Sequence, residues 1–94
     1  MVREIRIRKL KAEEARRKLE AELESAFLRG ERHVRIIHGI GTFKLRQLTA
    51  TVVEEMGLGR VLPDSLGRNP GVTEVELDPP PETVLRWHLR PAKS

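Results

Sequence analysis

The sequence predicts an α/β (α+β) two-layer sandwich, in which two helices cover one face of a four-stranded mixed sheet. Two periodicities support this class. Apolar and charged residues alternate in short segments, and apolar residues recur every three or four positions in longer ones. The resulting order of elements is β-α-β-α-β-β. A length of 94 residues is enough for one domain with a modest core.

The first predicted strand covers residues 3–8, where isoleucine alternates with arginine. Ile5 and Ile7 therefore face the core, and the arginines face outward. The next segment, from residue 12, has the apolar spacing of a helix that covers the sheet. The residues of its apolar stripe are Ala15, Leu19, Leu23, Ala26 and Phe27. Gly30 suits the position just past the end of this helix.

The second strand is expected at residues 34–37, and its nearly continuous apolar character indicates a central place in the sheet. Gly39 and Gly41 form the following turn, and Thr42 is suited to cap the N-terminus of the second helix. The apolar stripe of that helix consists of Leu45, Leu48, Val52 and Met56.

Gly57 and Gly59 are expected to end the second helix, and residues 60–62 to form a short third strand. Residues 63–71 have the composition of a loop. The last strand covers residues 72–77, where inward and outward side chains alternate. Its inward residues are Thr73, Val75 and Leu77, and its outward residues are Glu74 and Glu76. We expect the two glutamates to pair with basic residues across the sheet.

If the strands lie in sequential order, the two β-α-β crossovers place both helices on the same face of the sheet. The other face then meets solvent, and Arg6 and Arg8 lie on it, where they can contact a ligand. We divide the chain into a domain over residues 1–78 and a proline-rich C-terminal extension over residues 79–94.

The net charge of +4 is concentrated in the first half of the chain. Residues 1–50 hold 13 Lys and Arg against 7 Asp and Glu, whereas residues 51–94 hold 5 against 7. This asymmetry favours a polyanion as partner of the basic half, with a well-solvated basic surface as the alternative.

The composition also excludes several classes of function. The absence of cysteine excludes disulfides, thiol catalysis and cysteine zinc sites. No apolar run reaches the length of a membrane span and no signal peptide is present, which predicts a cytoplasmic protein without a membrane partner. Few aromatic residues argue against a single-strand binder with several stacking rings.

The strongest functional signal is the segment at residues 34–46, in which a buried strand, a glycine turn and the start of a helix follow one another. This geometry directs backbone N–H groups and a helix N-terminus at one point, and such a point attracts phosphate. Lys44 and Arg46 lie in the first helical turn beside it. The turn geometry alone also explains the glycines.

The run HGIGTFKLR at residues 38–46 resembles the Smr (small MutS-related) domain family, which shows His-Gly-x-Gly-Thr-Gly-x-Leu-Arg after its second strand. The run IRIRKL at residues 5–10 is similar to the family's Leu-Asp-Leu-His/Arg-Gly-Leu, and residues 71–77 are similar to its closing strand. The resemblance covers roughly residues 3–78.

The resemblance implies a fold like that of the C-terminal domain of translation initiation factor 3. It also implies binding of DNA or RNA. Many Smr domains are endonucleases that nick DNA or cleave RNA, in recombination suppressors, DNA repair or ribosome rescue.

His38 is the candidate catalytic residue that this resemblance implies, because imidazole suits general acid–base chemistry. The alternative is a histidine that fixes the turn through a hydrogen bond. The residues expected to bind phosphate are Arg6, Arg8, Lys9, Gly39, Gly41, Thr42, Lys44 and Arg46.

Three positions depart from the family pattern. Arg6 stands at its acidic position, Lys9 at the following glycine, and Phe43 at the last glycine of the second motif. A guanidinium cannot hold a metal or polarise a nucleophile, so binding is favoured over cleavage. The ring of Phe43 either stacks on a base or caps the core.

The three histidines, His33, His38 and His88, do not have the spacing of a metal site, so we expect no structural metal and no cofactor. Two alternatives to nucleic-acid binding stay open. One is a protein-interaction module with a degenerate site, supported by the acidic second half and Trp87. The other is a binder of small phosphorylated molecules.

Overall fold

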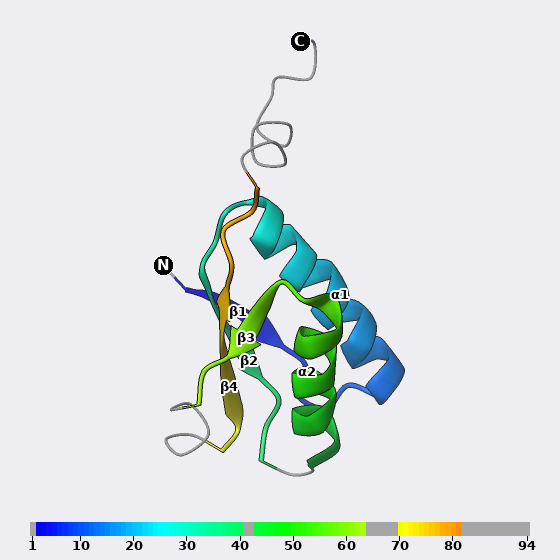
Figure 1. Cartoon of the computed structure of the whole chain (residues 1–94). Helices are drawn as coiled ribbons and strands as arrows, with labels where there is room; N and C mark the ends of the chain where they lie inside the picture. The colour runs from blue at the N-terminus through cyan, green and yellow to red at the C-terminus, as the bar shows by residue number, and fades with distance from the viewer. Residues whose placement is uncertain (1, 41–42, 64–69, 82–94) are drawn as a thin grey trace.

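The computed structural model describes residues 2–40, 43–63 and 70–81, and these residues form two layers (Figure 1). The strands of its sheet are β1 (Arg3–Arg6), β2 (His33–Ile37), β3 (Gly59–Val61) and β4 (Val72–Leu77). The helices are α1 (Ala12–Leu28) and α2 (Phe43–Met56). Both helices cover the same face of the sheet, so the predicted two-layer α+β class and element order are confirmed.

The strand order in the sheet is β1-β2-β4-β3, in which β1 and β2 are parallel and β4 is antiparallel to both neighbours. The sequential order assumed from the sequence is therefore wrong, because β4 is inserted between β2 and β3. Since β2 and β3 still run in the same direction, the connection through α2 is a crossover that places α2 beside α1. The central place predicted for β2 is confirmed.

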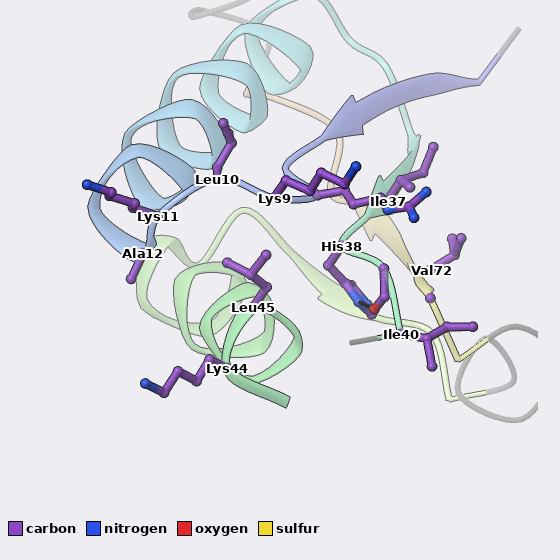
Figure 2. Close-up of a pocket in the computed structure, with 13 residues that line it drawn as sticks. Lys9, Leu10, Lys11, Ala12, Ile37, His38, Ile40, Lys44, Leu45 and Val72 are labelled. Atoms are coloured by element: carbon purple, nitrogen blue, oxygen red, sulfur yellow. Dashed lines mark hydrogen bonds between the residues drawn. The ribbon is translucent and has the colours of Figure 1, made fainter. Parts of the chain in front are cut away.

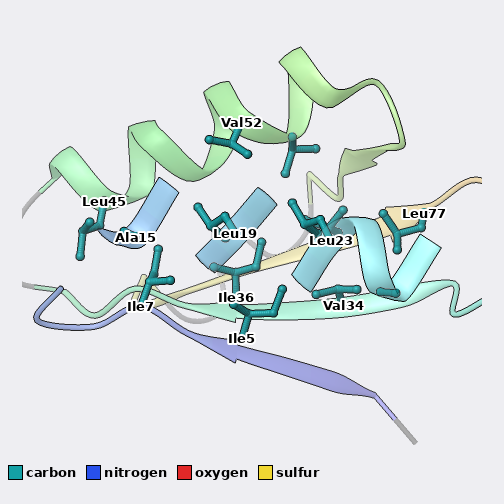
Figure 3. Packing of buried hydrophobic residues seen from close by; sticks show 13 residues of the cluster. Ile5, Ile7, Ala15, Leu19, Leu23, Val34, Ile36, Leu45, Val52 and Leu77 are labelled. Carbon is teal, nitrogen blue, oxygen red and sulfur yellow. The ribbon is translucent and has the colours of Figure 1, made fainter. Parts of the chain in front are cut away.

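The core lies between the sheet and the two helices (Figure 3). The inward face predicted for the last strand is confirmed, because Thr73, Val75 and Leu77 are buried. The other buried apolar residues are Ile5, Ile7, Ala15, Leu19, Leu23, Ala26, Val34, Ile36, Leu45, Val52 and Val53. In the described ranges, neither helix combines the length and the apolar composition that crossing a membrane requires.

Strand β1 ends at Arg6, two residues earlier than predicted. The backbone of Ile7 still donates a hydrogen bond of 3.0 Å to the carbonyl of Ile37, but the chain then turns. The N–H of Leu10 donates to the carbonyl of Ile7 at 3.1 Å, and Lys9 has a φ of +68°. This turn carries Arg8 and Lys9 away from the alternating face of the strand.

Strand β3 begins at Gly59, which the sequence pattern had placed at the end of the second helix. Gly57 ends that helix with a φ of +65°. A side chain at Gly59 would collide with the backbone carbonyl of Glu76 on β4, so this position requires glycine for close strand pairing. The C-terminal extension from residue 82, with Trp87 and His88, lies outside the described residues.

Candidate nucleic-acid interface

A cleft of about 880 Å³ lies at the edge of the sheet where the parallel strands β1 and β2 end (Figure 2). Chain segments after β1 and β2, the start of β4 and the first turns of both helices form its walls. Its lining residues are Arg8, Lys9, Leu10, Lys11, Ala12, Ile37, His38, Gly39, Ile40, Lys44, Leu45, Gly71 and Val72. In α/β sheets, ligands bind beyond the carboxyl ends of parallel strands, which is the place of this cleft.

The cleft is cationic. Its charged lining residues are Arg8, Lys9, Lys11 and Lys44, all exposed, and no carboxylate is among the lining residues. Within the part of the chain that the structure describes, none of these four side chains forms an ion pair. An anion that enters the cleft therefore meets several cations without competition from an acidic side chain.

Both helices begin at this cleft, with Ala12 of α1 and Lys44 of α2 in its wall. The first backbone N–H groups of a helix have no intrahelical partner, and the macrodipole adds partial positive charge there. Lys11 precedes α1 with extended backbone, and its side chain makes no capping hydrogen bond. The N-terminus of α1 therefore presents backbone N–H donors near the cleft, while Glu13 and Glu14 of its first turn offset part of its positive charge.

Gly39 has a φ of +81°, and a Cβ at this position would lie 3.2 Å from Cγ of Arg8. Glycine is favoured here by the left-handed backbone, and a Cβ would also force the Arg8 side chain to shift by a few tenths of an ångström. The N–H groups of His38 and Gly39 both donate to the carbonyl of Gly71, each at 3.0 Å. These two N–H groups are therefore occupied, and an anion in the cleft relies on side chains and helix ends.

His38 is 3% exposed, and both of its ring nitrogens are engaged. Nδ1 lies 3.0 Å from the carbonyl of Gly39, and Nε2 lies 2.8 Å from Oγ1 of Thr73. Because a carbonyl only accepts, Nδ1 carries the proton and Nε2 accepts from the threonine hydroxyl. These hydrogen bonds fix the turn after β2, whereas the catalytic role of His38 stays a prediction.

The pKa of His38 lies below its usual value because the ring is buried. The hydrogen bond to Gly39 opposes this shift, and the positive charge of Arg46 adds to it. The ring is therefore neutral at pH 7, and a neutral ring with its proton on Nδ1 is compatible with both hydrogen bonds.

The structure brings together five of the predicted site residues in one cleft: Arg8, Lys9, His38, Gly39 and Lys44. Arg8 reaches the cleft because β1 ends before it, which corrects its predicted position on the open face. Gly41 and Thr42 lie outside the described residues.

The predicted residues Arg6 and Arg46 do not line the cleft. The side chain of Arg6 is 73% exposed on the open face and forms an ion pair of 3.3 Å with Glu4. Arg46 is half-buried and lines a separate groove on the other side of α2.

Sequence reasoning missed Lys11 and Gly71 as residues of the cleft. Lys11 could have been found, since it stands directly before a helix that follows the first strand. The carbonyl of Gly71 meets the turn after β2 through tertiary pairing, for which the sequence contains no local signal.

The open face of the sheet carries balanced charge. Its ion pairs across strands join Arg35 to Glu4 at 3.6 Å, Arg35 to Glu74 at 3.9 Å and Arg60 to Glu76 at 2.8 Å. The predicted cross-strand pairing of both glutamates of β4 is thus confirmed. This pairing leaves the cleft as a stronger attractor of anions than the open face.

No group of three or more metal-ligating side chains occurs among the residues that the structure describes. Glu4, which neighbours the predicted residue Arg6 on the open face, is engaged with Arg6 and Arg35.

The Smr domain model matches residues 5–81 of this chain. Among solved structures, the chain is similar to the Smr domain of Thermus thermophilus MutS2, with a TM-score of 0.69 and 31% sequence identity. That match covers 82% of this chain and 99% of the other. No curated protein matches the sequence. Family match and structural similarity agree with the motif at residues 38–46, and the chain belongs to the Smr domain family.

Proposed function

We propose that this Smr domain binds nucleic acid and seats backbone phosphates in the cleft between the starts of α1 and α2. The observation that carries the proposal is the set of four cationic side chains, Arg8, Lys9, Lys11 and Lys44, without a carboxylate in the lining. Membership of the Smr family supports DNA or RNA as the polyanion.

The cations of the cleft have different roles in this proposal. Arg8 packs against Gly39 and presents a planar guanidinium, which suits two hydrogen bonds to one phosphate. Lys9, Lys11 and Lys44 act as point charges around it. Contacts of this kind position the strand and supply affinity without reading the base sequence.

Binding without cleavage is the activity that this site supports best. Arg6 stands at the acidic position of the family pattern and is paired with Glu4 on the open face. His38 has both ring nitrogens in internal hydrogen bonds, so neither is directed at a substrate. We therefore propose that the domain holds phosphate but does not hydrolyse it.

The binding proposal is tested by fluorescence anisotropy with branched DNA and structured RNA. We expect the double variant Lys11→Gln/Lys44→Gln to lose roughly tenfold or more in affinity for both, because it removes two phosphate contacts. Arg29→Gln is the matched control, since Arg29 lies just past α1 at the end of the helix opposite the cleft. Equal affinity of the double variant and the control would contradict the proposal.

The absence of cleavage is tested separately with supercoiled plasmid and structured RNA in the presence of Mg²⁺. We expect wild-type protein and His38→Ala to show the same background. Nicking or cutting that disappears in His38→Ala would overturn this part of the proposal. Arg6→Asp is the informative comparator, because gain of cleavage would show that the charge reversal silences an otherwise intact site.

A further inference from the structure

Phe43, the first residue of α2, projects into solvent with 71% of its surface exposed. The suggestion from the sequence that its ring caps the core is therefore wrong. Ile40, within the turn after β2, is 75% exposed as well. A lone exposed apolar side chain needs no explanation, but the ring of Phe43 lines a groove together with other apolar residues.

The ring of Phe43 forms one wall of a groove of about 460 Å³. Ala50 of α2, together with Val61 and Pro63 at the end of β3, provides further apolar lining. This volume lies within the range of small-molecule pockets, about 300–1,000 Å³. The groove can therefore receive a flat apolar group such as a nucleobase.

Polar groups border this apolar lining. Arg46 and Gln47 of α2 also line the groove. The guanidinium of Arg46 supplies several N–H donors, and the amide of Gln47 supplies both a donor and an acceptor. The lining surface is predominantly apolar, which suits the face of a nucleobase, and Arg46 and Gln47 supply the few groups that can meet its hydrogen-bonding edges.

The groove and the cationic cleft share a wall. His38 lines the cleft, and its Nε2 accepts a hydrogen bond of 2.8 Å from Thr73, which lines the groove. On α2, Lys44 lines the cleft, whereas its neighbour Phe43 lines the groove. One side of this wall thus suits a phosphate, and the other side suits a base.

We propose that the groove receives an unstacked nucleobase of the strand whose phosphate occupies the cleft, with the base stacked on Phe43. This proposal rests on nucleic-acid binding at the cleft and adds a substrate class to it. Because the bases of a continuous duplex are not available for such stacking, the domain prefers nucleic acid with an unpaired base, as at a junction, gap or bulge.

The test compares two DNA duplexes that differ by one unpaired thymine. We expect wild-type protein to bind the duplex with the unpaired base roughly tenfold more tightly, in line with stacking of one base on one ring. Phe43→Ala is expected to bind both duplexes equally, whereas Phe43→Tyr keeps the preference. Phe43→Leu loses most of it, because it retains apolar surface without a π face.

A direct readout places 5-iodouracil at the unpaired position and maps photocrosslinks by mass spectrometry. Crosslinking at residue 43 supports the proposal. Equal wild-type affinity for the two duplexes, with no crosslink at residue 43, would overturn it. If Lys11→Gln/Lys44→Gln still weakens binding to the continuous duplex in that case, the proposal of phosphate binding at the cleft is retained and only the proposal of base binding in the groove is refuted.

A second copy of the chain is the competing occupant of the groove. Sedimentation velocity of the protein without nucleic acid distinguishes it. A monomer is expected, in both wild type and Phe43→Ala. A dimer that dissociates in Phe43→Ala would assign the groove to self-association and overturn the proposal.

Discussion

Lys9 is the clearest case of a residue that favours nucleic-acid binding while it lowers the stability of the fold. The family pattern has glycine at this position, and Lys9 adopts the left-handed φ of +68° that glycine accommodates easily. For a residue with a Cβ, this conformation costs about 1–2 kcal/mol. Strained backbone of this kind occurs at functional sites, and Lys9 lies in the wall of the cationic cleft.

We predict that Lys9→Gly raises the free energy of unfolding by about 1 kcal/mol, because it relieves this strain. The same variant loses affinity for nucleic acid several-fold, because it removes a cation. Urea denaturation and anisotropy measure the two effects. Lys9→Gln keeps the Cβ and removes the charge, so it is expected to weaken binding without stabilising the fold. A destabilised Lys9→Gly would contradict the account.

His38 predicts a pH dependence of stability. Its pKa in the folded protein lies below the value of about 6.5 expected in the unfolded chain. As the pH falls below 6.5, the unfolded chain takes up a proton that the folded protein resists, so stability is lost. Urea unfolding at pH 7.5 and pH 5.5 measures this loss, and His38→Gln should reduce it. A ring that titrates above pH 6.5 in NMR spectra would refute the prediction.

The hydrogen bond between His38 and Thr73 is expected to stabilise the wall between the cleft and the groove. Thr73→Val leaves Nε2 of the buried ring without its donor, so we expect a loss of about 1–2 kcal/mol in unfolding free energy. Thr49→Val is the comparator, because the Thr49 hydroxyl bonds only within α2, to the carbonyl of Leu45. Equal effects of the two substitutions would argue against a special role of the wall.

At the scale of elements, the pairing of β3 with β4 depends on Gly59. A Cβ there would collide with the backbone of Glu76, and backbone atoms cannot rotate away as a flexible side chain does. We predict that Gly59→Ala destabilises the protein by roughly 3 kcal/mol, in the range of severe steric substitutions. A Cβ at Gly57 has no neighbour within 4 Å, so Gly57→Ala costs only the strain of the positive φ, roughly 1–2 kcal/mol. A larger loss of stability in Gly57→Ala than in Gly59→Ala would contradict the observed pairing of β3 with β4.

Most elements could be predicted from the sequence because each one carries its own apolar period. The alternation in β4 predicts its buried side chains correctly, and so does the helical stripe of α1, except that Phe27 is only partly buried. The place of β4 between β2 and β3 could not be predicted, because an apolar pattern specifies a buried face but not a neighbouring strand.

The candidate site was predictable to the same extent. The glycine turn at residues 38–41 and the basic residues near it indicated an anion site at one edge of the sheet. The early end of β1, which moves Arg8 into the cleft, depends on a turn after Ile7 that strand alternation does not reveal. The exposure of Phe43 likewise follows from tertiary packing, since a ring at the start of a helix can face either way.

Over the described residues, the distribution of charge makes one edge of the molecule the more favourable place for a polyanion. Ion pairs across strands neutralise the open face of the sheet, whereas the four cations of the cleft form none within the described residues. The two helix starts lie at this edge as well. The far end differs, because Arg3 there is held by Glu31 at 2.8 Å and by Glu22 at 3.1 Å.

The salt dependence of affinity tests the central claim most directly. Neutralised phosphates release counterions, so the logarithm of the association constant falls linearly with the logarithm of salt concentration. We predict that Lys11→Gln and Lys44→Gln each make this slope shallower by about one, and that Arg29→Gln leaves it unchanged. A wild-type affinity that does not fall with salt, or a slope that neither cleft variant changes, would contradict phosphate binding at the cleft.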